Sequence, residues 1–416
     1  MNPEIYIDAP DSFILPSRYL RLRGWCFQPG VAFTGMRLVL PDRELFGRYG
    51  VFRPDVRTAY PGAPDDFTGF ELWAIIPHGR HAAKLQFKDP QGKWLTAMSL
   101  EITAPRSWWP MWSSRTSRRD LVEFQLGVRP SHAPRAVQAE RFPPPLPLGH
   151  VRPKLSVVTP SYNQARFLGQ TMDSVLSQIG AHVTYVVQDG GSTDGSVELL
   201  HRYAPRLTAW HSGPDAGQAD AIAHGFARTI GQPDDLMAWL NSDDVYLRGA
   251  LAFVTDYFSR HPEVDVLYGQ RVLIDEESRE VGRWFLPAHD DEMLKLNDYV
   301  PQEALFWRRR VWDKVGGIDP SFKFAMDWDL LLRFQASGAK IVRVPYFLAC
   351  FRIHATQKTS GQMESLGHRE IDTLRTKTQG RTLTHAEVES HPRLLAYLRQ
   401  SAWHEFLWRR LGWRAP

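Results

Sequence analysis

The sequence predicts an α/β catalytic domain with a mostly parallel sheet, preceded by an all-β, sandwich-like domain and followed by C-terminal helices. Short apolar runs at residues 155–159, 183–188 and 236–240 end in polar clusters and alternate with helical patterns. This alternation indicates a parallel sheet with helices on its faces. Residues 1–104 instead carry short strand-like runs without a long amphipathic helix, and residues 361–416 carry helical patterns. Three parts with different periodicities therefore follow one another along the chain.

Length and charge restrict the classes of function. The 416 residues are enough for two or three domains with sizeable cores. A formal net charge of +4 gives no reason to expect a nucleic-acid partner. Cys26 and Cys350 fall in different predicted domains, which fits a reducing compartment. The N-terminus lacks a signal-peptide pattern, and no apolar stretch approaches the roughly 20 residues of a membrane span. We therefore expect a cytoplasmic protein.

The N-terminal domain is expected to be a β-sandwich-like accessory domain spanning residues 1–104. Turn signals such as Pro29-Gly30 separate its strand-like runs. Exposed aromatic side chains would suit carbohydrate recognition, but Trp25 and Trp73 lie within strand-like runs, which favours a packing role. Residues 105–150 are expected to form a proline-rich linker, because their prolines interrupt any regular pattern.

In the predicted catalytic domain, residues 151–360, polar side chains follow the buried strands. The carboxyl ends of parallel strands form the edge where ligands bind in such sheets. The polar and turn residues at the three strand ends are Pro160, Tyr162 and Asn163, then Asp189, then Asn241, Asp243 and Asp244. This shared edge is the main functional signal in the sequence.

Two further segments contribute to the same edge. The glycines of residues 190–195 allow a tight turn, and Ser192 or Thr193 can cap the helix that follows, so an ordinary strand–turn–helix junction would also explain this motif. Asp220 falls in the first turn of a helix expected from Gln218, where the helix dipole alone favours a carboxylate.

Asp243 and Asp244 are candidates for binding a divalent cation. Hard cations prefer carboxylate oxygens, and paired carboxylates at a strand end supply them. A capped turn before the next helix would explain the same residues without a metal.

The downstream segments add acidic and amide side chains. Gln302 and Glu303 precede a strand-like run, and Asp327 and Asp329 open a helix. Residues two apart on a helix face nearly opposite sides, so these two aspartates need separate roles. An N-cap would explain Asp327 without chemistry.

These ordered motifs resemble the core of family 2 glycosyltransferases, which have the GT-A fold, a Rossmann-like and mostly parallel sheet. The resemblance covers roughly residues 151–354 and includes D-x-G-Q-x-D-A-I at residues 215–222, N-S-D-D at 241–244 and A-x-F-R-x-H at 349–354. It implies an inverting enzyme that uses Mn²⁺ or Mg²⁺ and a nucleotide diphosphate sugar. The implied acceptor is a glycan or lipid-linked glycan in bacterial surface-polysaccharide synthesis.

The resemblance also implies roles for individual residues. Asp189 would contact the nucleotide base and Asp220 would hold the nucleotide. Asp244 would bind the metal, Asp243 would face the ribose or a metal-bound water, and Asp327 would be the catalytic base. The remaining expected contacts are Pro160, Tyr162, Asn163, Asn241 and Arg352 with the donor, Gln302, Glu303 and Trp328 with the acceptor, and His354 with the metal or the diphosphate. A purely structural role for His354 is about equally expected.

The C-terminal helical extension, residues 361–416, is basic and rich in tryptophan near its end. Such a helix suits peripheral contact with an anionic membrane, for which the inner face of the cytoplasmic membrane is the expected site, but packing on the catalytic domain or a dimer contact explains it better.

Two other functions fit part of the sequence. One is a non-catalytic carbohydrate-binding protein with a degenerate transferase domain, which the presence of Asp244 and Asp327 disfavours. The other is a nucleotidyltransferase, which usually needs a basic phosphate loop that residues 190–195 lack.

Overall fold

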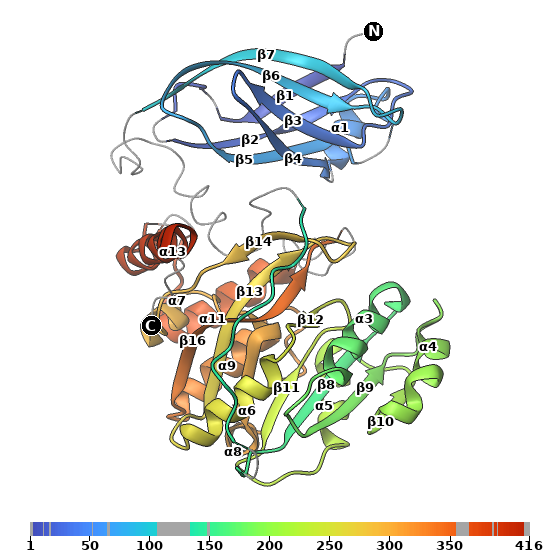
Figure 1. Ribbon diagram of the computed structural model, residues 1–416, viewed down its shortest axis with the longest axis vertical. Coiled ribbons are helices and arrows are strands. Elements are labelled where there is room, and N and C mark those ends of the chain that lie inside the picture. Colours follow the sequence, from blue (N-terminus) through green and yellow to red (C-terminus); the bar gives the residue numbers. More distant parts are fainter. Residues whose placement is uncertain are drawn as a thin grey trace. The chain divides into compact units, whose positions relative to one another are not determined.

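The computed structural model describes residues 3–10, 12–15, 18–51, 53–64, 67–105, 134–147, 150–354, 366–384, 387–388 and 390–411 (Figure 1). The described residues up to Pro105 belong to one compact unit, and those from Pro134 belong to another. Most of the expected linker, residues 106–133, lies outside the described residues. Residues 134–147 run along the second unit, where the Leu146 N–H donates to Asp256 at 2.8 Å.

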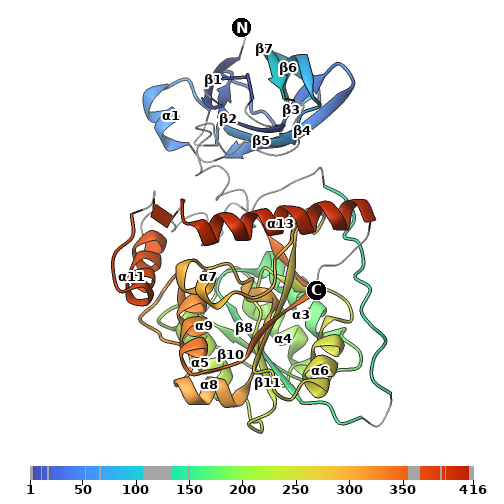
Figure 2. The same ribbon diagram turned by 90° about the vertical axis from the view of Figure 1, so that its left-hand side faces the viewer.

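The N-terminal unit is an antiparallel sheet that curls so that its two halves share one core (Figure 2). Its strand order is β1-β2-β5-β4-β3-β6-β7, and a bridge between Ile14 and Thr103 connects the segment after β1 with β7. The elements are β1 (Glu4–Ala9), β2 (Tyr19–Phe27), β3 (Gly35–Leu40), β4 (Arg43–Val51), α1 (Pro54–Ala59), β5 (Gly69–Ile75), β6 (Gly79–Lys88) and β7 (Trp94–Ala104). The predicted sandwich-like domain is therefore confirmed.

Trp25 lies in a small apolar cluster beside this core, with Phe27, Val56 and Ala63. It is 7% exposed, which agrees with a packing role rather than carbohydrate recognition. The side chain of Trp73 is outside the described part of the structure.

The second unit is built on a sheet with the order β10-β9-β8-β11-β15-β13-β16-β12, and β14 pairs with β13. Its strands are β8 (Leu155–Ser161), β9 (Val183–Asp189), β10 (Ala209–Ser212), β11 (Leu236–Trp239), β12 (Val245–Tyr246), β13 (Val266–Ile274), β14 (Glu280–Trp284), β15 (Leu305–Arg308) and β16 (Ile341–Arg352). The strands β9, β8 and β11 are parallel, as predicted, and β10, which was not predicted from the sequence, continues this parallel part. Because β15, β12 and β14 run antiparallel to their neighbours, the remainder of the sheet is mixed.

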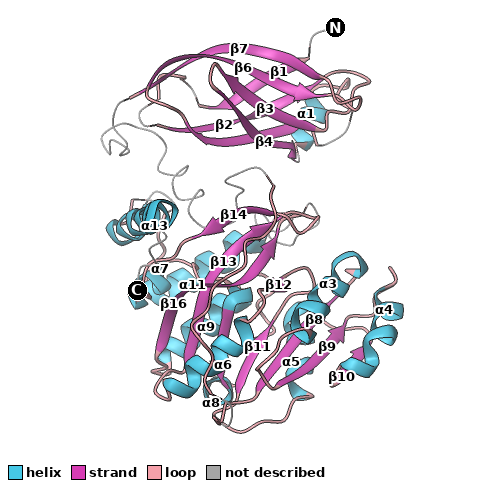
Figure 3. Cartoon of the chain, viewed as in Figure 1, coloured by secondary structure: helices cyan, strands magenta, loops and turns pink. Residues whose placement is uncertain are grey.

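Helices cover both faces of this sheet (Figure 3). They are α3 (Ala165–Leu176), α4 (Ser196–Tyr203), α5 (Gln218–Ala227), α6 (Ala250–Arg260), α7 (Asp291–Leu296), α8 (Arg309–Val315), α9 (Met326–Ala336), α11 (His368–Gln379) and α13 (Pro392–Leu411), with short 3₁₀ turns η1 (Ala204–Arg206) and η2 (Gln302–Ala304). Successive side chains of a strand point to opposite faces, so Val157 and Val158 of β8 enter different cores. This two-sided burial explains why the central strands read as continuous apolar runs.

The C-terminal helices pack on the second unit. Leu374 of α11 and Leu394, Tyr397 and Leu398 of α13 are buried in the core that α9 also lines. Packing on the catalytic domain, one of the two expected explanations, therefore accounts for the apolar face of α13. Among the described residues, no helix combines the length and apolar character that a membrane crossing requires.

Candidate functional site

The carboxyl ends of β8, β9 and β11 lie at one edge of the sheet, because these strands are parallel neighbours. Ser161 at the end of β8 pairs with Asp189 at the end of β9. The chain then continues from β11 into Asn241 and the two aspartates that follow. The strand-end residues predicted from sequence are thus brought together at this edge.

Asp189 shapes the turn that follows β9. Its buried carboxylate accepts hydrogen bonds from the N–H groups of Gly191 (3.1 Å) and Ser192 (2.9 Å) and from the hydroxyls of Ser192 (2.6 Å) and Ser212 (2.7 Å). Both oxygens are occupied by the protein itself. The structure therefore gives Asp189 a role inside the turn, and the expected contact with a nucleotide base gains no support from its geometry.

The end of β8 is tied to the same turn. Asn163 has a left-handed backbone conformation, with φ of 51°, which Asn tolerates better than most residues. Its N–H donates to the Ser192 hydroxyl at 2.7 Å, and its side-chain oxygen accepts from the Thr193 N–H at 2.9 Å. Pro160 is buried within β8, whereas the side chain of Tyr162 is 63% exposed. Of these residues, Tyr162 presents the largest accessible surface to a ligand.

Asp194 links this turn to two helices. Its carboxylate accepts from the Ala165 N–H (2.8 Å), the Ser196 N–H (3.1 Å) and the Ser196 hydroxyl (2.6 Å). Partial burial acts to raise the pKa of Asp194, but the hydrogen bonds from Ser196 and Ala165 outweigh it and hold the pKa below its ordinary value.

The lowered pKa of Asp194 predicts an acid-dependent contribution to stability. A depressed folded-state pKa stabilises the native state above the unfolded-state value, about 3.9, and this stabilisation is lost as the pH falls through the folded-state pKa. We expect Asp194→Asn to lower the melting temperature at pH 7 and to have a smaller effect near pH 3. Thermal unfolding across this pH range measures the difference, and an equal loss at both pH values would contradict the assignment.

The side chains of Asn241 and Gln302 are linked by hydrogen bonds that connect separate elements. Gln218 of α5 donates to the Asn241 oxygen at 2.8 Å, and Asn241 donates to the Gln302 oxygen at 3.1 Å. Gln302 in turn donates to the Trp239 carbonyl at 2.9 Å. Asp220, in the first turn of α5, accepts from the Ala216 N–H at 3.0 Å. These contacts fix the α5 start against the end of β11.

The acidic pair after β11 contains an unpartnered buried oxygen. Asp244 is 1% exposed, its Oδ1 accepts from the Arg352 N–H at 3.0 Å, and its Oδ2 has no hydrogen-bond partner. Burial first, and then the charges of Asp243 and Glu303, raise the pKa of Asp244 well above its ordinary value. A buried carboxylate oxygen without a partner is costly, so this site favours an added cation.

His354 pairs with the other aspartate. Its Nε2 lies 2.9 Å from Asp243 Oδ2, and its buried ring contacts the ring of Phe167 at 4.9 Å between centroids. His354 is 3% exposed, so these two contacts hold its ring beside the acidic pair. Asp243 remains half-buried, at the exposed side of the pair.

The acidic pair fits a cation that is held mainly by substrate. No group of three or more His, Cys, Asp or Glu side chains in the described ranges has the arrangement of a metal site. Magnesium-like cations are commonly bound through one or two carboxylates, with phosphates and waters as the other ligands. Asp243 and Asp244 provide carboxylates of this kind.

The side chain of Arg352 is buried beside the acidic pair. It is 0% exposed, and its guanidinium donates to the carbonyls of Asp243 (2.8 Å) and Asp275 (3.0 Å), the Ser278 hydroxyl (2.9 Å) and the Gln170 side chain (2.8 Å). These contacts and the Arg352 N–H hold the acidic pair in place.

The side chains of Glu303 and Trp328 are also buried. Both Glu303 oxygens accept from the Arg271 guanidinium at 2.7 Å, and Glu303 is 1% exposed. Trp328 is 0% exposed, and its indole N–H donates to the Leu294 carbonyl at 2.8 Å. Sequence reasoning missed Arg271 because nothing local indicates that a residue of an expected hairpin pairs with Glu303.

The buried Arg271–Glu303 pair should be sensitive to removal of one partner. We expect Glu303→Ala to destabilise the second unit by about 3–5 kcal/mol, because it leaves a buried guanidinium without its counter-charge. Replacing both residues by Met and Leu should recover much of the loss. Chemical denaturation of the two variants tests this, and a stability change below about 1 kcal/mol in Glu303→Ala would contradict it.

Asp327 and Asp329 have separate surroundings, as helical geometry predicts. Asp329 is buried and accepts from the Arg333 Nε at 2.8 Å, whereas Asp327 is half-buried and its Oδ1 accepts from the Trp328 N–H at 3.0 Å. Glu370 of α11 stabilises the segment before α9 by accepting hydrogen bonds from three backbone N–H groups. They are those of Lys323 (2.9 Å), Phe324 (2.8 Å) and Ala325 (2.9 Å).

Asp298 is a second carboxyl near Asp327 that sequence reasoning missed. Burial first, and then the charge of Asp327, raise the pKa of Asp298 well above its ordinary value, with a further contribution from Glu303. The same Glu303 acts on Asp244. The charge of Glu303 therefore acts both on the acidic pair and on Asp298 beside Asp327.

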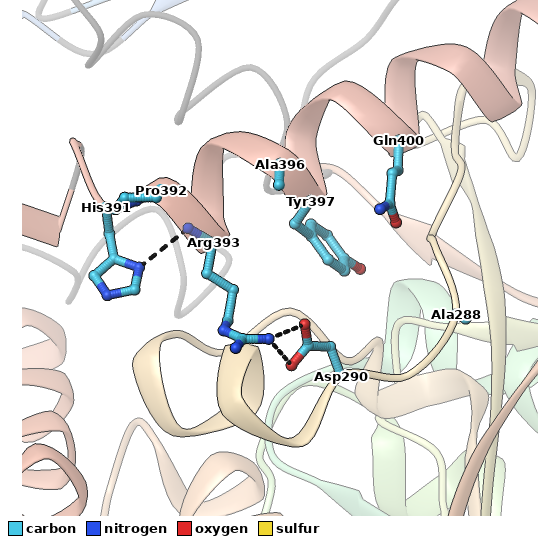
Figure 4. A pocket seen from close by; sticks show the side chains of 8 residues that line it. All are labelled: Ala288, Asp290, His391, Pro392, Arg393, Ala396, Tyr397 and Gln400. Carbon is cyan, nitrogen blue, oxygen red and sulfur yellow. Dashed lines mark hydrogen bonds and ion pairs between the residues drawn. The ribbon is translucent and has the colours of Figure 1, made fainter.

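A pocket of about 560 Å³ lies elsewhere, between the start of α13 and the loop before α7 (Figure 4). Arg393 forms a two-pronged ion pair with Asp290 there, at 2.8 and 3.0 Å. The lining residues are Ala288, Asp290, His391, Pro392, Arg393, Ala396, Tyr397 and Gln400. None of them is a residue predicted for the strand-end site.

Comparison with known proteins connects this geometry with a family. The model of the family described as "Glycosyl transferase family 2" matches residues 156–314. An uncharacterized glycosyltransferase of Mycobacterium tuberculosis is 31% identical over 204 residues, which cover 48% of this chain and 73% of that protein. A PGL/p-HBAD biosynthesis glycosyltransferase of the same species is 27% identical over 195 residues, or 46% of this chain and 73% of that protein. An O-antigen biosynthesis protein of Myxococcus xanthus is 29% identical over 195 residues, or 46% of this chain and 15% of that protein.

Solved structures give weaker likenesses. TarS of S. aureus in complex with UDP-GlcNAc has a TM-score of 0.44 at 16% identity and covers 63% of this chain and 73% of that one. The mannosyltransferase PcManGT of Pyrobaculum calidifontis, in complex with GDP-Man and Mn²⁺, has a TM-score of 0.43 at 15% identity and covers 70% of this chain and 81% of that one. These scores add nothing to the assignment, which rests on the sequence matches and on the strand-end site. The chain belongs to glycosyl transferase family 2, and the matched residues lie in its second unit.

Proposed function

We propose that this protein is an inverting, metal-dependent glycosyltransferase that moves a sugar from a nucleotide diphosphate sugar to a glycan or lipid-linked glycan. The observation that carries the proposal is the acidic pair after β11, in which the buried Oδ2 of Asp244 has no partner. The names of the relatives, which include a PGL/p-HBAD and an O-antigen biosynthesis protein, support a role in bacterial surface-polysaccharide synthesis.

The donor would lie along the strand-end edge. Tyr162 and the turn after β9 would receive the nucleoside, and Asp243 and Asp244 would face the diphosphate through Mn²⁺ or Mg²⁺. When bound, the cation would neutralise the charge that develops on the departing diphosphate. Arg352 acts as a positioning residue, because it holds the Asp243 carbonyl and the Asp244 carboxylate through its guanidinium and N–H.

Asp327 would act as the general base. Its carboxylate takes the proton of the acceptor hydroxyl while that oxygen forms a bond to the anomeric carbon. The bond from the anomeric carbon to the diphosphate breaks on the opposite face, the nucleoside diphosphate leaves, and the configuration inverts. Asp298 is half-buried beside this position.

The products test this reaction against the nucleotidyltransferase alternative. Purified protein is incubated with nucleotide diphosphate sugars, bacterial glycan and lipid-linked acceptors, and Mn²⁺ or Mg²⁺. We expect a nucleoside diphosphate to be released and the new linkage to have the opposite anomeric configuration by NMR. Release of pyrophosphate, or retention of configuration, would contradict the proposal.

Membrane contact is proposed through α13. This helix buries Leu394 and Leu398 against the second unit but leaves Trp403 47% exposed. A basic helix with an exposed tryptophan suits the surface of the inner face of a cytoplasmic membrane. In a flotation assay, more wild-type protein should be recovered with anionic vesicles than with neutral vesicles. Trp403→Ala should reduce the recovery with anionic vesicles. Equal recovery of the wild type with both kinds of vesicle and of the variant with anionic vesicles would argue against this contact.

A further inference from the structure

Gly190 lies in the turn between β9 and α4 and has no side chain. A residue from another segment lies in the space beside it. A Cβ atom at Gly190 would lie 2.8 Å from Asp215 Oδ2 and 3.3 Å from the Tyr162 ring. The Asp215 carboxylate therefore lies where the side chain of a larger residue at position 190 would be. Asp215 comes from the loop before α5, so this proximity is created by the fold.

The Asp215 carboxylate is held in a fixed orientation. Its Oδ1 accepts from the Gly217 N–H at 2.8 Å. The neighbouring Ala216 is fixed on both sides, because its N–H donates to Asp220 at 3.0 Å and its carbonyl accepts from Lys323 at 2.9 Å. No hydrogen bond to Asp215 Oδ2 is found among the described residues, whereas both oxygens of Asp189 are occupied.

We infer that Asp215, rather than Asp189, selects the nucleobase of the donor, by accepting a hydrogen bond from a ring N–H while the base lies against Tyr162. The inference rests on the proposed function and names a specificity residue for the same site. A carboxylate can only accept hydrogen bonds. Uracil and thymine (N3–H) and guanine (N1–H) offer a ring donor on the pairing edge, whereas cytosine and adenine offer a ring acceptor there. The exposed Tyr162 ring supplies a stacking surface for any base.

The decisive variant is Asp215→Asn. The Gly217 N–H requires an acceptor, so the amide oxygen should take the Oδ1 position and the amide nitrogen the Oδ2 position. A donor then replaces the acceptor that faces the base. We expect UDP or GDP to bind about 10- to 100-fold more weakly, which corresponds to the loss of one hydrogen bond to a charged group. CDP should bind as well as or better than in the wild type.

Two further variants separate this role from structural effects. Asp189→Asn disturbs the turn and should weaken UDP, GDP and CDP by similar factors. Gly190→Ala places a Cβ against Asp215 Oδ2 and should weaken UDP or GDP without improving CDP. Calorimetric titration of each nucleotide with Mg²⁺, on variants shown to be folded by circular dichroism, provides the comparison.

The outcomes distinguish this inference from the proposed function. A reversed UDP-to-CDP preference in Asp215→Asn supports it. Nucleotide binding with an unchanged base preference in Asp215→Asn, or a preference that changes only in Asp189→Asn, overturns the inference and leaves the transferase proposal standing. Failure of the folded wild-type protein to bind any nucleotide would overturn both.

Discussion

Asp327→Asn is expected to reduce sugar transfer by about 10²- to 10⁴-fold while leaving donor binding unchanged. General-base catalysis typically contributes a factor of this size, and an amide cannot accept the acceptor proton. Asp327 is half-buried at the start of α9, whereas the donor would be held by residues at the ends of β8, β9 and β11. Turnover under saturating donor, together with a donor titration, measures the two effects separately.

Asp329→Asn is the matched control for this prediction. Asp329 is buried and pairs with Arg333 four residues on, so its replacement should lower stability and leave turnover per folded molecule near the wild-type value. If Asp327→Asn retained near-normal turnover, Asp327 would not be the base, and Asp298 would become the next carboxyl to replace.

Asp244→Asn is expected to weaken metal-dependent donor binding by at least about tenfold. The substitution removes a carboxylate oxygen that has no partner in the protein and that a cation would satisfy. The stability of the free protein should change little. Burying an amide costs less free energy than burying a carboxylate whose Oδ2 has no partner. Donor titrations with and without Mn²⁺ measure the change.

Asp235→Asn provides a control in the same sheet. Asp235 accepts from the Lys154 N–H at 2.9 Å and the Gln232 N–H at 2.7 Å at the amino end of β11, away from the strand-end site. Its replacement should leave the metal effect intact. An Mn²⁺ dependence that is as large in Asp244→Asn as in the wild type would remove Asp244 from the metal site.

Periodicity explains why the fold was predictable. The central strands are buried on both faces, so β8 and β9 appear in the sequence as largely apolar runs that end in polar residues. Their parallel arrangement then places Ser161 beside Asp189 without further information. The β-rich N-terminal unit follows from its regular turn signals in the same way.

Long-range pairing explains what could not be predicted. Glu303, Arg352 and Trp328 carry polar or aromatic groups that suggested ligand contacts, but distant partners engage them in the interior. A sequence pattern shows that a charge is present and does not show that Arg271 neutralises it. Similarly, the loop that carries Asp215 lies beside Gly190 because β10 and α5, which flank this loop, pack beside β9.

The most direct test of the strand-end site is a thermal-shift screen of the purified protein against UDP-, GDP-, dTDP- and CMP-sugars, with and without Mn²⁺ or Mg²⁺. A ligand that binds only the folded state stabilises it by about 2.7 kcal/mol at a hundred times its Kd. We expect stabilisation by nucleotide diphosphate sugars that requires the cation and disappears in Asp244→Asn. The absence of any shift with every donor, in a protein shown to be folded, would contradict a nucleotide-sugar site and favour a non-catalytic carbohydrate-binding protein.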